Sequence, residues 1–236
     1  MKQSYSLVTG ASSGIGLEIS KYLAKRGNNI ILTARRESII SKISKKIRDD
    51  YDVKTDYICS DLSDSDGPKK IFKFCQTKKY YVNTIINNAG YGISAPFHKS
   101  NMLEEEKCIR VMSISIISLT KLFIPSMIEK GYGRIMIVSS VAAFAPPSAI
   151  QSMYGPTKTF ANRINEAINI NYNKNGIFST AVCPGYTITN FHSASGVQEE
   201  MDRVPNFLKK SAKRIAYESV EAMFKKKSIY IPTKTW

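Results

Sequence analysis

Histidine and paired cysteines are scarce in this 236-residue chain, which limits the metal chemistry open to it. The chain has two histidines and four cysteines. Cys59, Cys75, Cys108 and Cys183 form no Cys-x-x-Cys pair and no spacing typical of metal ligands. We therefore expect neither a structural zinc site nor a disulfide framework, and we predict that the protein binds no metal.

Long apolar runs are also missing. Residues Met1 to Gly10 contain no apolar stretch long enough for a signal peptide. Nowhere does a run approach the roughly 20 apolar residues that a membrane span requires. Together with the unpaired cysteines, this predicts a reduced, cytoplasmic protein without a membrane partner.

Acidic residues are few relative to basic ones. The 19 Asp and Glu residues face 34 Lys and Arg residues, which gives a formal net charge of +15. Such a charge is compatible with binding to a nucleic acid or an anionic membrane. The lysines, however, occur as scattered pairs and triplets, such as Lys45-Lys46, Lys69-Lys70 and Lys225-Lys226-Lys227, without a basic arm or an aromatic-interleaved stripe. We favour a lysine-rich composition spread over the whole chain, and no nucleic-acid partner.

Strand and helix patterns alternate along the chain. Short apolar runs typical of buried strands lie at Ser6–Val8, Asn29–Thr33, Lys54–Cys59, Asn83–Ile86, Gly133–Ser139, Ile177–Cys183 and Ser228–Ile231. Helical periodicity between them covers Glu18–Lys25, Ser38–Asp50, Pro68–Gln76, Asn101–Glu129, about Gly155–Asn173 and Ser211–Phe224. This alternation predicts an α/β fold of the Rossmann type, a doubly wound parallel sheet of about seven strands with helices on both faces. Without a repeat or linker, residues 1–236 form one predicted domain.

A glycine-rich turn follows the first predicted strand. Its sequence is Thr9-Gly10-Ala11-Ser12-Ser13-Gly14-Ile15-Gly16, and a helix pattern comes directly after it. A strand, a glycine turn and a helix form the context in which a dinucleotide binds. The pyrophosphate would lie at the N-terminus of the helix, where free N–H groups and the helix dipole favour an anion.

A tyrosine and a lysine four residues apart, Tyr154 and Lys158, share one face of a predicted helix. A phenol ordinarily loses its proton near pH 10. We expect the nearby ammonium to lower the pKa of Tyr154 towards the range useful for acid–base catalysis. Ser140 precedes the tyrosine and can donate a hydrogen bond to a carbonyl oxygen that the tyrosine protonates. The Tyr-x-x-x-Lys spacing alone is weak evidence, because both residues are common on solvated helices.

The catalytic interpretation of this spacing is supported by five motifs that occur in the expected order along the chain. The glycine turn, Asn87-Asn88-Ala89-Gly90, Ser140, Tyr154 to Lys158, and Pro184-Gly185 follow one another in order. From about Tyr5 to Ile231 the chain resembles the short-chain dehydrogenase/reductase family in its one-domain form. The resemblance implies an oxidoreductase that interconverts a ketone or aldehyde and an alcohol by hydride transfer with a nicotinamide cofactor. Tyr154 would protonate the alkoxide, Ser140 would orient the carbonyl, and Lys158 would bind the nicotinamide ribose.

The resemblance also implies a set of cofactor contacts. Asp61 would close the adenine pocket, small residues after Asn87 would let the ribose approach, and the turn after Pro184 would hold the nicotinamide carboxamide. The cofactor-binding positions expected in this way are Gly10, Ser12, Ser13, Gly14, Ile15, Gly16, Arg35, Asp61, Leu62, Asn87, Ala89, Gly90, Tyr154, Lys158, Thr187 and Thr189.

The end of the second predicted strand bears on the choice of cofactor. Proteins that prefer NAD usually place an acid there, to hold the ribose 2′-hydroxyl. This chain has Ala34-Arg35-Arg36 instead, and a guanidinium pairs well with a 2′-phosphate. Two solvated arginines ahead of a helix are the simpler alternative. We expect NADP(H) to be preferred over NAD(H).

Two segments are candidates for the substrate pocket. The apolar loop Ala143–Ile150 would form a wall, and residues 191–210 lie where the family has a substrate-covering lid. Their composition favours an apolar small-molecule substrate with a carbonyl or alcohol group. The family commonly assembles as dimers or tetramers through two long helices, here about Asn101–Glu129 and Gly155–Asn173, so we expect a homodimer or homotetramer.

One position departs from the family pattern. The asparagine that helps to relay protons to the lysine falls on Met112, and a thioether cannot donate a hydrogen bond. Ser113 or Ser115 could hold the missing water. The departure leaves open a second class of function, a cofactor-binding sensor or interaction partner with little catalysis, although Ser140, Tyr154 and Lys158 all remain. A nucleic-acid binder is a third class, for which the chain has no recognisable motif.

Overall fold

Seven parallel strands form one sheet in the computed structural model, which describes residues 4–146, 153–189, 195–196 and 198–232. Their spatial order is β3-β2-β1-β4-β5-β6-β9. Each strand begins and ends within two residues of its predicted range. The bounds are β1 Ser4–Thr9, β2 Asn29–Ala34, β3 Thr55–Cys59, β4 Tyr81–Asn87, β5 Gly133–Val138, β6 Ile177–Val182 and β9 Ile229–Tyr230. The predicted doubly wound parallel sheet is confirmed.

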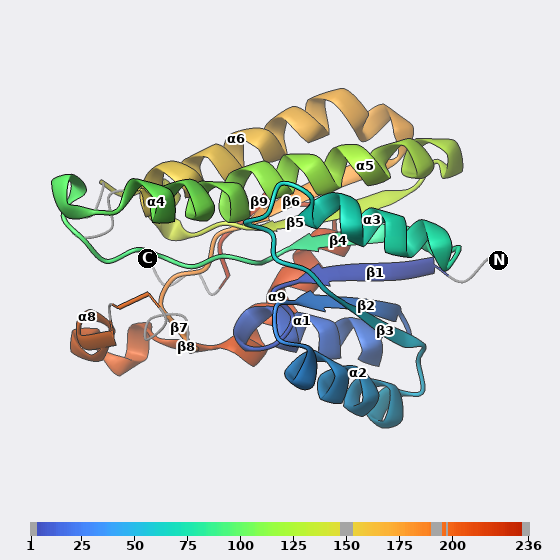
Figure 1. Ribbon diagram of the computed structural model, residues 1–236, viewed down its shortest axis with the longest axis horizontal. Helices are drawn as coiled ribbons and strands as arrows, with labels where there is room; N and C mark the ends of the chain where they lie inside the picture. The colour runs from blue at the N-terminus through green and yellow to red at the C-terminus, as the bar shows by residue number, and fades with distance from the viewer. Residues whose placement is uncertain (1–3, 147–152, 190–194, 197, 233–236) are drawn as a thin grey trace.

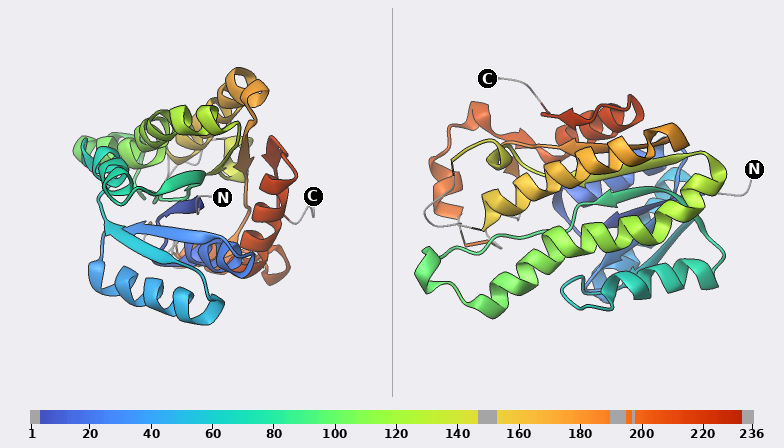
Figure 2. Two further views of the ribbon diagram at one scale, coloured as in Figure 1. Left: turned by 90° about the vertical axis from the view of Figure 1, so that its right-hand side faces the viewer. Right: turned by 90° about the horizontal axis from the view of Figure 1, so that it is seen from above.

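Helices cover both faces of the sheet (Figure 1). Helices α1 (Gly14–Lys25), α2 (Glu37–Tyr51) and α9 (Ala212–Phe224) lie on one face. On the other face lie α3 (Gly67–Thr77), a long helix built from α4 (Met102–Ile109) and α5 (Ser115–Lys130), and α6 (Tyr154–Tyr172). Figure 2 shows the strands between these two helical layers.

The two layers explain why the strands are apolar throughout. Leu7, Ile31 and Ile85 belong to the core cluster under α5 and α6, whereas their neighbours Val8 and Ile30 belong to the cluster under α1 and α9. Successive side chains of a strand point to opposite faces, so a sheet covered on both sides requires apolar residues at every position.

The long helix contains one irregular turn. Between α4 and α5, residues Arg110–Ile114 form a π-helix, and Met112 lies in it. The sequence predicted one continuous helix here, but a single π turn leaves no mark on apolar periodicity. Such turns occur often at functional sites.

The same helix, Met102–Lys130, is long and apolar enough to cross a membrane, with a mean hydropathy of 1.8 in its most apolar window. This differs from the expectation that no such segment exists, because Ser113, Ser115 and Ser118 interrupt the apolar run without lowering its average much. Of that window, 56% is buried inside the protein. A buried core helix of a globular domain has the same length and composition, so the finding is weak evidence for a span.

The inward face of α6 carries polar residues. Asn162 and Asn165 are buried, while Ala167 and Asn171 are exposed. Strand β9 pairs with β6 only at Ala181 and Val182. The edge of β6 that β9 leaves open is paired with Asn169. The Asn169 amide donates to the Ser179 carbonyl at 2.8 Å and accepts from the Ser179 N–H at 2.8 Å. Asparagine is favoured here because it pairs backbone groups that no strand covers.

A small second sheet stands beyond the carboxyl ends of the strands. It joins β7 (Thr187–Ile188) to β8 (Lys210–Ser211), and helix α8 (Gln198–Arg203) lies between them in the chain. The predicted lid, 191–210, maps to this region, although residues 190–194 and 197 lie outside the described part of the chain. These two-residue strands are too short to leave a periodic pattern in the sequence.

Candidate active site

A cleft of about 840 Å³ runs along the carboxyl ends of the strands. Parallel sheets place their ligand sites at this edge, where the strand order reverses. Here the order reverses between β1 and β4. Most of the predicted site residues lie along the cleft. Those that line it are Gly10, Ser12, Ser13, Gly14, Ile15, Arg35, Asp61, Leu62, Ala89, Gly90, Ser140, Tyr154, Lys158, Thr187 and Thr189.

The glycine turn forms one end of the cleft. Gly10 and Gly14 have φ angles of 63° and 56°, a backbone conformation that favours glycine. A Cβ on Gly10 would lie 2.9 Å from the Cα of Ala89. Gly16 does not line the cleft, because it packs inward, where a Cβ would collide with the Asn88 amide and lie 2.6 Å from the Gly10 carbonyl oxygen. Its role is thus to let helix α1 approach β4.

The Asn-Asn pair differs from its predicted arrangement. Asn87 is buried, does not line the cleft, and neither amide atom has a hydrogen-bond partner among the described residues. Asn88 lines the cleft instead, and its amide donates to the carbonyls of Thr9 at 2.9 Å and Gly10 at 3.2 Å. Because side chains alternate along a strand, the second asparagine, not the first, ties β4 to β1.

Two arginines, Arg35 and Arg36, follow the carboxyl end of β2. Arg35 and Arg36 both line the cleft, are exposed, and form no ion pair among the described residues. Across from them, the Asp61 carboxylate accepts hydrogen bonds from the N–H and the hydroxyl of Ser63 at 2.9 and 2.8 Å. The cleft therefore carries unpaired positive charge at Arg35 and Arg36, and a carboxylate held by hydrogen bonds at Asp61.

Ser140, Tyr154 and Lys158 come together at the centre. Ser140 ends the segment after β5, where its hydroxyl accepts from the Ala142 N–H at 3.1 Å, and it also hydrogen-bonds with Tyr154. Tyr154 is the first residue of α6, and Lys158 follows one turn later. The Lys158 Nζ lies 5.4 Å from the centre of the Tyr154 ring and donates to the Val138 carbonyl at 2.9 Å.

The electrostatics of this group differ from the prediction. Burial raises the pKa of Tyr154 to about 12, and the Ser140 hydrogen bond offsets this only in part. Burial also lowers the pKa of Lys158 to about 8. The expected lowering of the tyrosine pKa is therefore wrong for the protein alone, because the loss of solvent outweighs the ammonium, which is directed at the Val138 carbonyl.

Met112 lies beside the lysine. A Cβ on Gly90 would be 3.2 Å from the Met112 sulfur and 3.8 Å from the Lys158 Nζ, so all three groups are neighbours. Ser115, one of the two serines considered as a substitute, donates its hydroxyl to the Val111 carbonyl of its own helix at 2.7 Å. That hydroxyl hydrogen is thus already engaged.

The turn after Pro184 closes the cleft near the glycine turn. Thr187 donates to the Gly185 carbonyl at 3.0 Å, and a Cβ on Gly14 would lie 3.3 Å from a methyl carbon of Thr189. The β7–β8 pairing holds this turn in place.

Apolar side chains form the remaining wall. Ala145 and Pro146 of the predicted loop line the cleft, while residues 147–150 lie outside the described part. Tyr91, Val111 and Met201 also line the cleft, although none of them was among the predicted site residues. Met201 belongs to α8 in the predicted lid, and it is buried. Val111 was missed because the π turn, which helical periodicity does not reveal, sets its direction.

The residues of the cleft fit a phosphorylated dinucleotide. The glycine cradle has no room for a Cβ at Gly10, the two arginines are unpaired, and the volume is typical of a small-molecule site. No group of three or more histidine, cysteine or acidic residues suited to a metal ion is found within the described ranges.

Comparisons with known proteins agree with this fit. Residues 5–200 match the family model for short chain dehydrogenases. The chain is 31% identical over 196 residues to hydroxysteroid dehydrogenase-like protein 1 of Gallus gallus, covering 82% of this chain and 58% of that protein. It is 26% identical over 219 residues to the very-long-chain 3-oxoacyl-CoA reductase of Bos taurus, covering 91% of this chain and 69% of that protein.

A solved structure has the same fold. The short-chain dehydrogenase from Sphingobium yanoikuyae in complex with NADPH superposes with a TM-score of 0.91 at 24% identity, covering 99% of this chain and 89% of that one. The chain spans less than two thirds of the length of the Gallus gallus relative. Sequence, fold and cleft agree that this chain belongs to the short-chain dehydrogenase/reductase family.

Proposed function

We propose that the protein is an NADP(H)-dependent oxidoreductase that interconverts a ketone or aldehyde and an alcohol. The observation that carries the proposal is the position of Ser140, Tyr154 and Lys158 on the same cleft as the glycine turn and Arg35. A bound nicotinamide supplies or accepts the hydride. The chain supplies the groups that hold the carbonyl and handle the proton.

Each of the three residues has a distinct role in the reductive direction. Ser140 donates a hydrogen bond to the carbonyl oxygen and polarises it. Tyr154 gives its phenolic proton to that oxygen as an alkoxide forms. Lys158 places a positive charge near the phenol, which favours the phenolate that remains. The raised pKa of Tyr154, about 12, keeps the phenol protonated before reaction, as an acid requires.

We also propose that the substrate is a bulky apolar carbonyl. Val111, Ala145, Pro146 and Met201 give the cleft an apolar wall. The names of two relatives, a hydroxysteroid dehydrogenase-like protein and a very-long-chain oxoacyl-CoA reductase, point to large apolar compounds. A panel of steroid, long-chain and small hydrophilic ketones with NADPH tests this proposal. Faster turnover of the hydrophilic ketones would refute it.

The preference for NADP(H) rests on Arg35. Replacing Arg35 with Asp removes a charge-assisted hydrogen bond to the 2′-phosphate, worth roughly 1.5–3 kcal/mol. We expect Arg35→Asp to weaken NADPH binding by roughly ten- to a hundredfold and to leave NADH binding nearly unchanged. Titration of both cofactors by calorimetry measures this. Equal affinity of the wild type for NADPH and NADH would contradict the preference.

A sensor or partner protein that binds the cofactor without turnover is the second candidate. The one observation in its favour is Met112 beside Lys158. Methionine stands there in place of the family's asparagine, whose amide helps to relay protons to the lysine. Tight NADPH binding without turnover on any carbonyl would favour this candidate.

A further inference from the structure

Glu105 is a buried carboxylate in a surface helix. Only 8% of it is exposed, whereas its neighbours Glu104 and Glu106 are exposed. A buried carboxylate is costly unless it is hydrogen-bonded. The Ser100 hydroxyl lies 2.7 Å from a Glu105 carboxylate oxygen and 2.9 Å from the Phe97 carbonyl oxygen, and its one hydrogen can be donated to either. Glu105 has no role predicted from the sequence, because an acid near the start of a helix ordinarily faces solvent.

A second, much smaller cavity lies between Glu105 and the active site. Its volume is about 10 Å³, close to the space that one water molecule requires. Glu105, Ser100, Cys108, Met112 and Tyr154 are among its lining residues. The carboxylate, the hydroxyl and the thiol give a water there polar partners. Tyr154 lines both this cavity and the large cleft.

The proposed reaction consumes a proton at Tyr154 in each turnover. Each reduction takes the phenolic proton of Tyr154, so a proton must return before the next turnover. The Met112 thioether has no proton to donate, and Ser115 is bonded to its own helix. Burial raises the pKa of the Cys108 thiol to about 11, so it is a poor carrier at neutral pH.

We propose that Glu105 returns the proton to Tyr154 through one water in this cavity. The inference rests on the proposed function and adds a positioning residue to it. The Glu105 carboxylate takes a proton from solvent by way of the Ser100 hydroxyl and passes it to the water as the water gives a proton to the phenolate oxygen of Tyr154. The carboxylate is then restored. No other reactant is needed.

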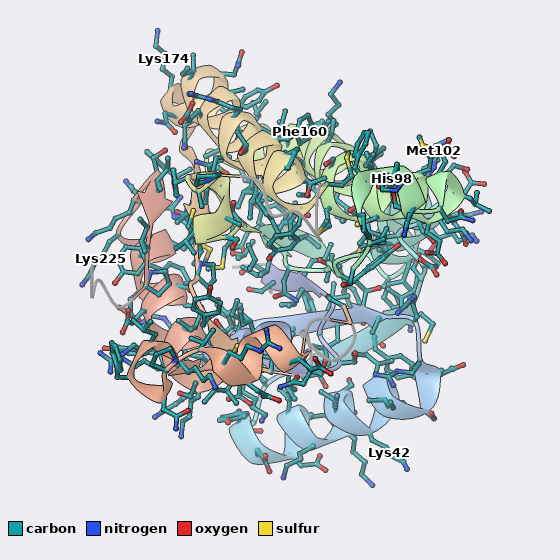
Figure 3. All side chains as sticks on the ribbon, turned by 90° about the vertical axis from the view of Figure 1, so that its left-hand side faces the viewer. Lys42, His98, Met102, Phe160, Lys174 and Lys225 are labelled. Carbon is teal, nitrogen blue, oxygen red and sulfur yellow. The ribbon has the colours of Figure 1, made fainter. Side chains whose placement is uncertain are left out.

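The outer end of this path lies at the surface. Ser100 is half-buried and lies one residue before Asn101, the N-cap of α4, between His98 and Met102 in the chain. His98 and Met102 are both exposed, and Figure 3 labels them close together at this end of the molecule. Glu105 thus connects a surface hydroxyl to a cavity that reaches Tyr154.

A purely structural role for Glu105 makes a different prediction. Its bond with Ser100 could simply fix the start of α4, where the Asn101 side chain already caps the helix by accepting from Leu103 at 2.9 Å. A glutamine at this position keeps the shape and can still accept the Ser100 hydrogen bond, but it cannot exchange the proton. Glu105→Gln therefore separates the two roles.

The test measures steady-state reduction of a ketone substrate by NADPH. General acid–base steps contribute about 10²–10⁴-fold, and the open cleft also admits water, so we expect Glu105→Gln to lower kcat by about 10²-fold. The KM for the ketone and the Kd for NADPH should stay unchanged. The solvent deuterium isotope effect on kcat should rise, because proton return becomes rate-limiting. The kinetic isotope effect measured with deuterated NADPH should fall for the same reason. Glu106→Gln, an exposed change in the same helix, should leave all of these values unchanged.

Two outcomes would overturn the proposal. The first is a Glu105→Gln variant with the kcat and isotope effects of the wild type. If that variant does not unfold cooperatively, Ser100→Ala decides, because loss of the outer link should lower kcat and raise the solvent isotope effect in the same way. The second is a wild type that reduces no carbonyl with either cofactor, which would overturn the proposed function together with the relay.

Discussion

At the scale of a single residue, Lys158 lowers the free energy of unfolding of the protein. It is buried, its Nζ donates to one carbonyl, and burial lowers its pKa from 10.5 to about 8. At about 1.36 kcal/mol per pKa unit, keeping this ammonium charged at pH 7 costs on the order of 3 kcal/mol. Such a cost is typical of a functional group held in a place that function requires.

This cost predicts a specific dependence of stability on pH. Below pH 8 the folded and unfolded states both hold the lysine proton, so the full penalty applies. Between about 8 and 10.5 only the unfolded state keeps the proton, and the contribution of Lys158 to stability rises with pH. We expect Lys158→Met to raise the Tm at pH 7. The Tm difference between variant and wild type should shrink from pH 7 to pH 9.5. A variant that melts lower than the wild type at pH 7 would contradict this prediction.

Residue types alone located much of the site but not its electrostatics. The helical spacing predicted that Tyr154 and Lys158 share a face, and the resemblance to the family predicted that Ser140 joins them. The direction of the Tyr154 pKa shift could not be predicted, because it depends on burial, which a spacing does not reveal. Glu105 was missed for the same reason: in the sequence it is one of three consecutive glutamates.

At the scale of elements, the contact between α1 and β4 shapes the cofactor cleft. Gly16 packs against the Asn88 amide and the Gly10 carbonyl, and Asn88 in turn fixes the ends of β1 and β4. The strands and most helices were predictable, because each is an apolar run of regular period. The π turn at Arg110–Ile114 and the short strands β7 and β8 were not, because their positions are set by tertiary packing.

A single methyl group at this contact is a sensitive probe. Gly16→Ala would force the Asn88 amide away from the carbonyls that it binds. Overpacking of this kind costs about 1–3 kcal/mol. We expect a lower Tm and weaker NADPH binding together, measured by thermal unfolding and calorimetry. As a control, Gly27→Ala places a Cβ where nothing lies within 4 Å, although its φ of 81° adds backbone strain. It should lower the Tm but keep NADPH affinity. Unchanged NADPH affinity in Gly16→Ala would show that this contact does not shape the cleft.

At the scale of the whole molecule, the positive charge is spread out. The labelled Lys42, Lys174 and Lys225 project from separate sides in Figure 3. That the protein has no nucleic-acid partner remains a prediction from the scattered lysine pairs of the sequence.

Self-association is a second property at this scale. The α4–α5 helix and α6 lie side by side on one face (Figure 1). Ile114, Ile128 and Ile170 expose 45%, 39% and 82% of their surface from these helices. We expect light scattering at micromolar concentration to give a dimer or tetramer mass, and Ile170→Lys to shift it towards the monomer. A wild-type mass near 26.4 kDa would contradict this.

The central claim is that the Ser140, Tyr154 and Lys158 group transfers a proton in an NADPH-dependent reduction. The most direct test compares the wild type with Tyr154→Phe, which removes only the phenolic hydroxyl and keeps the ring. Each protein is mixed with NADPH and a bulky apolar ketone, and the absorbance of the reduced nicotinamide is followed. We predict steady oxidation of NADPH by the wild type, a loss of about 10²–10⁴-fold in Tyr154→Phe, and NADPH affinity unchanged between them. A Tyr154→Phe variant that keeps most of the activity would show that another group supplies the proton and would contradict the account.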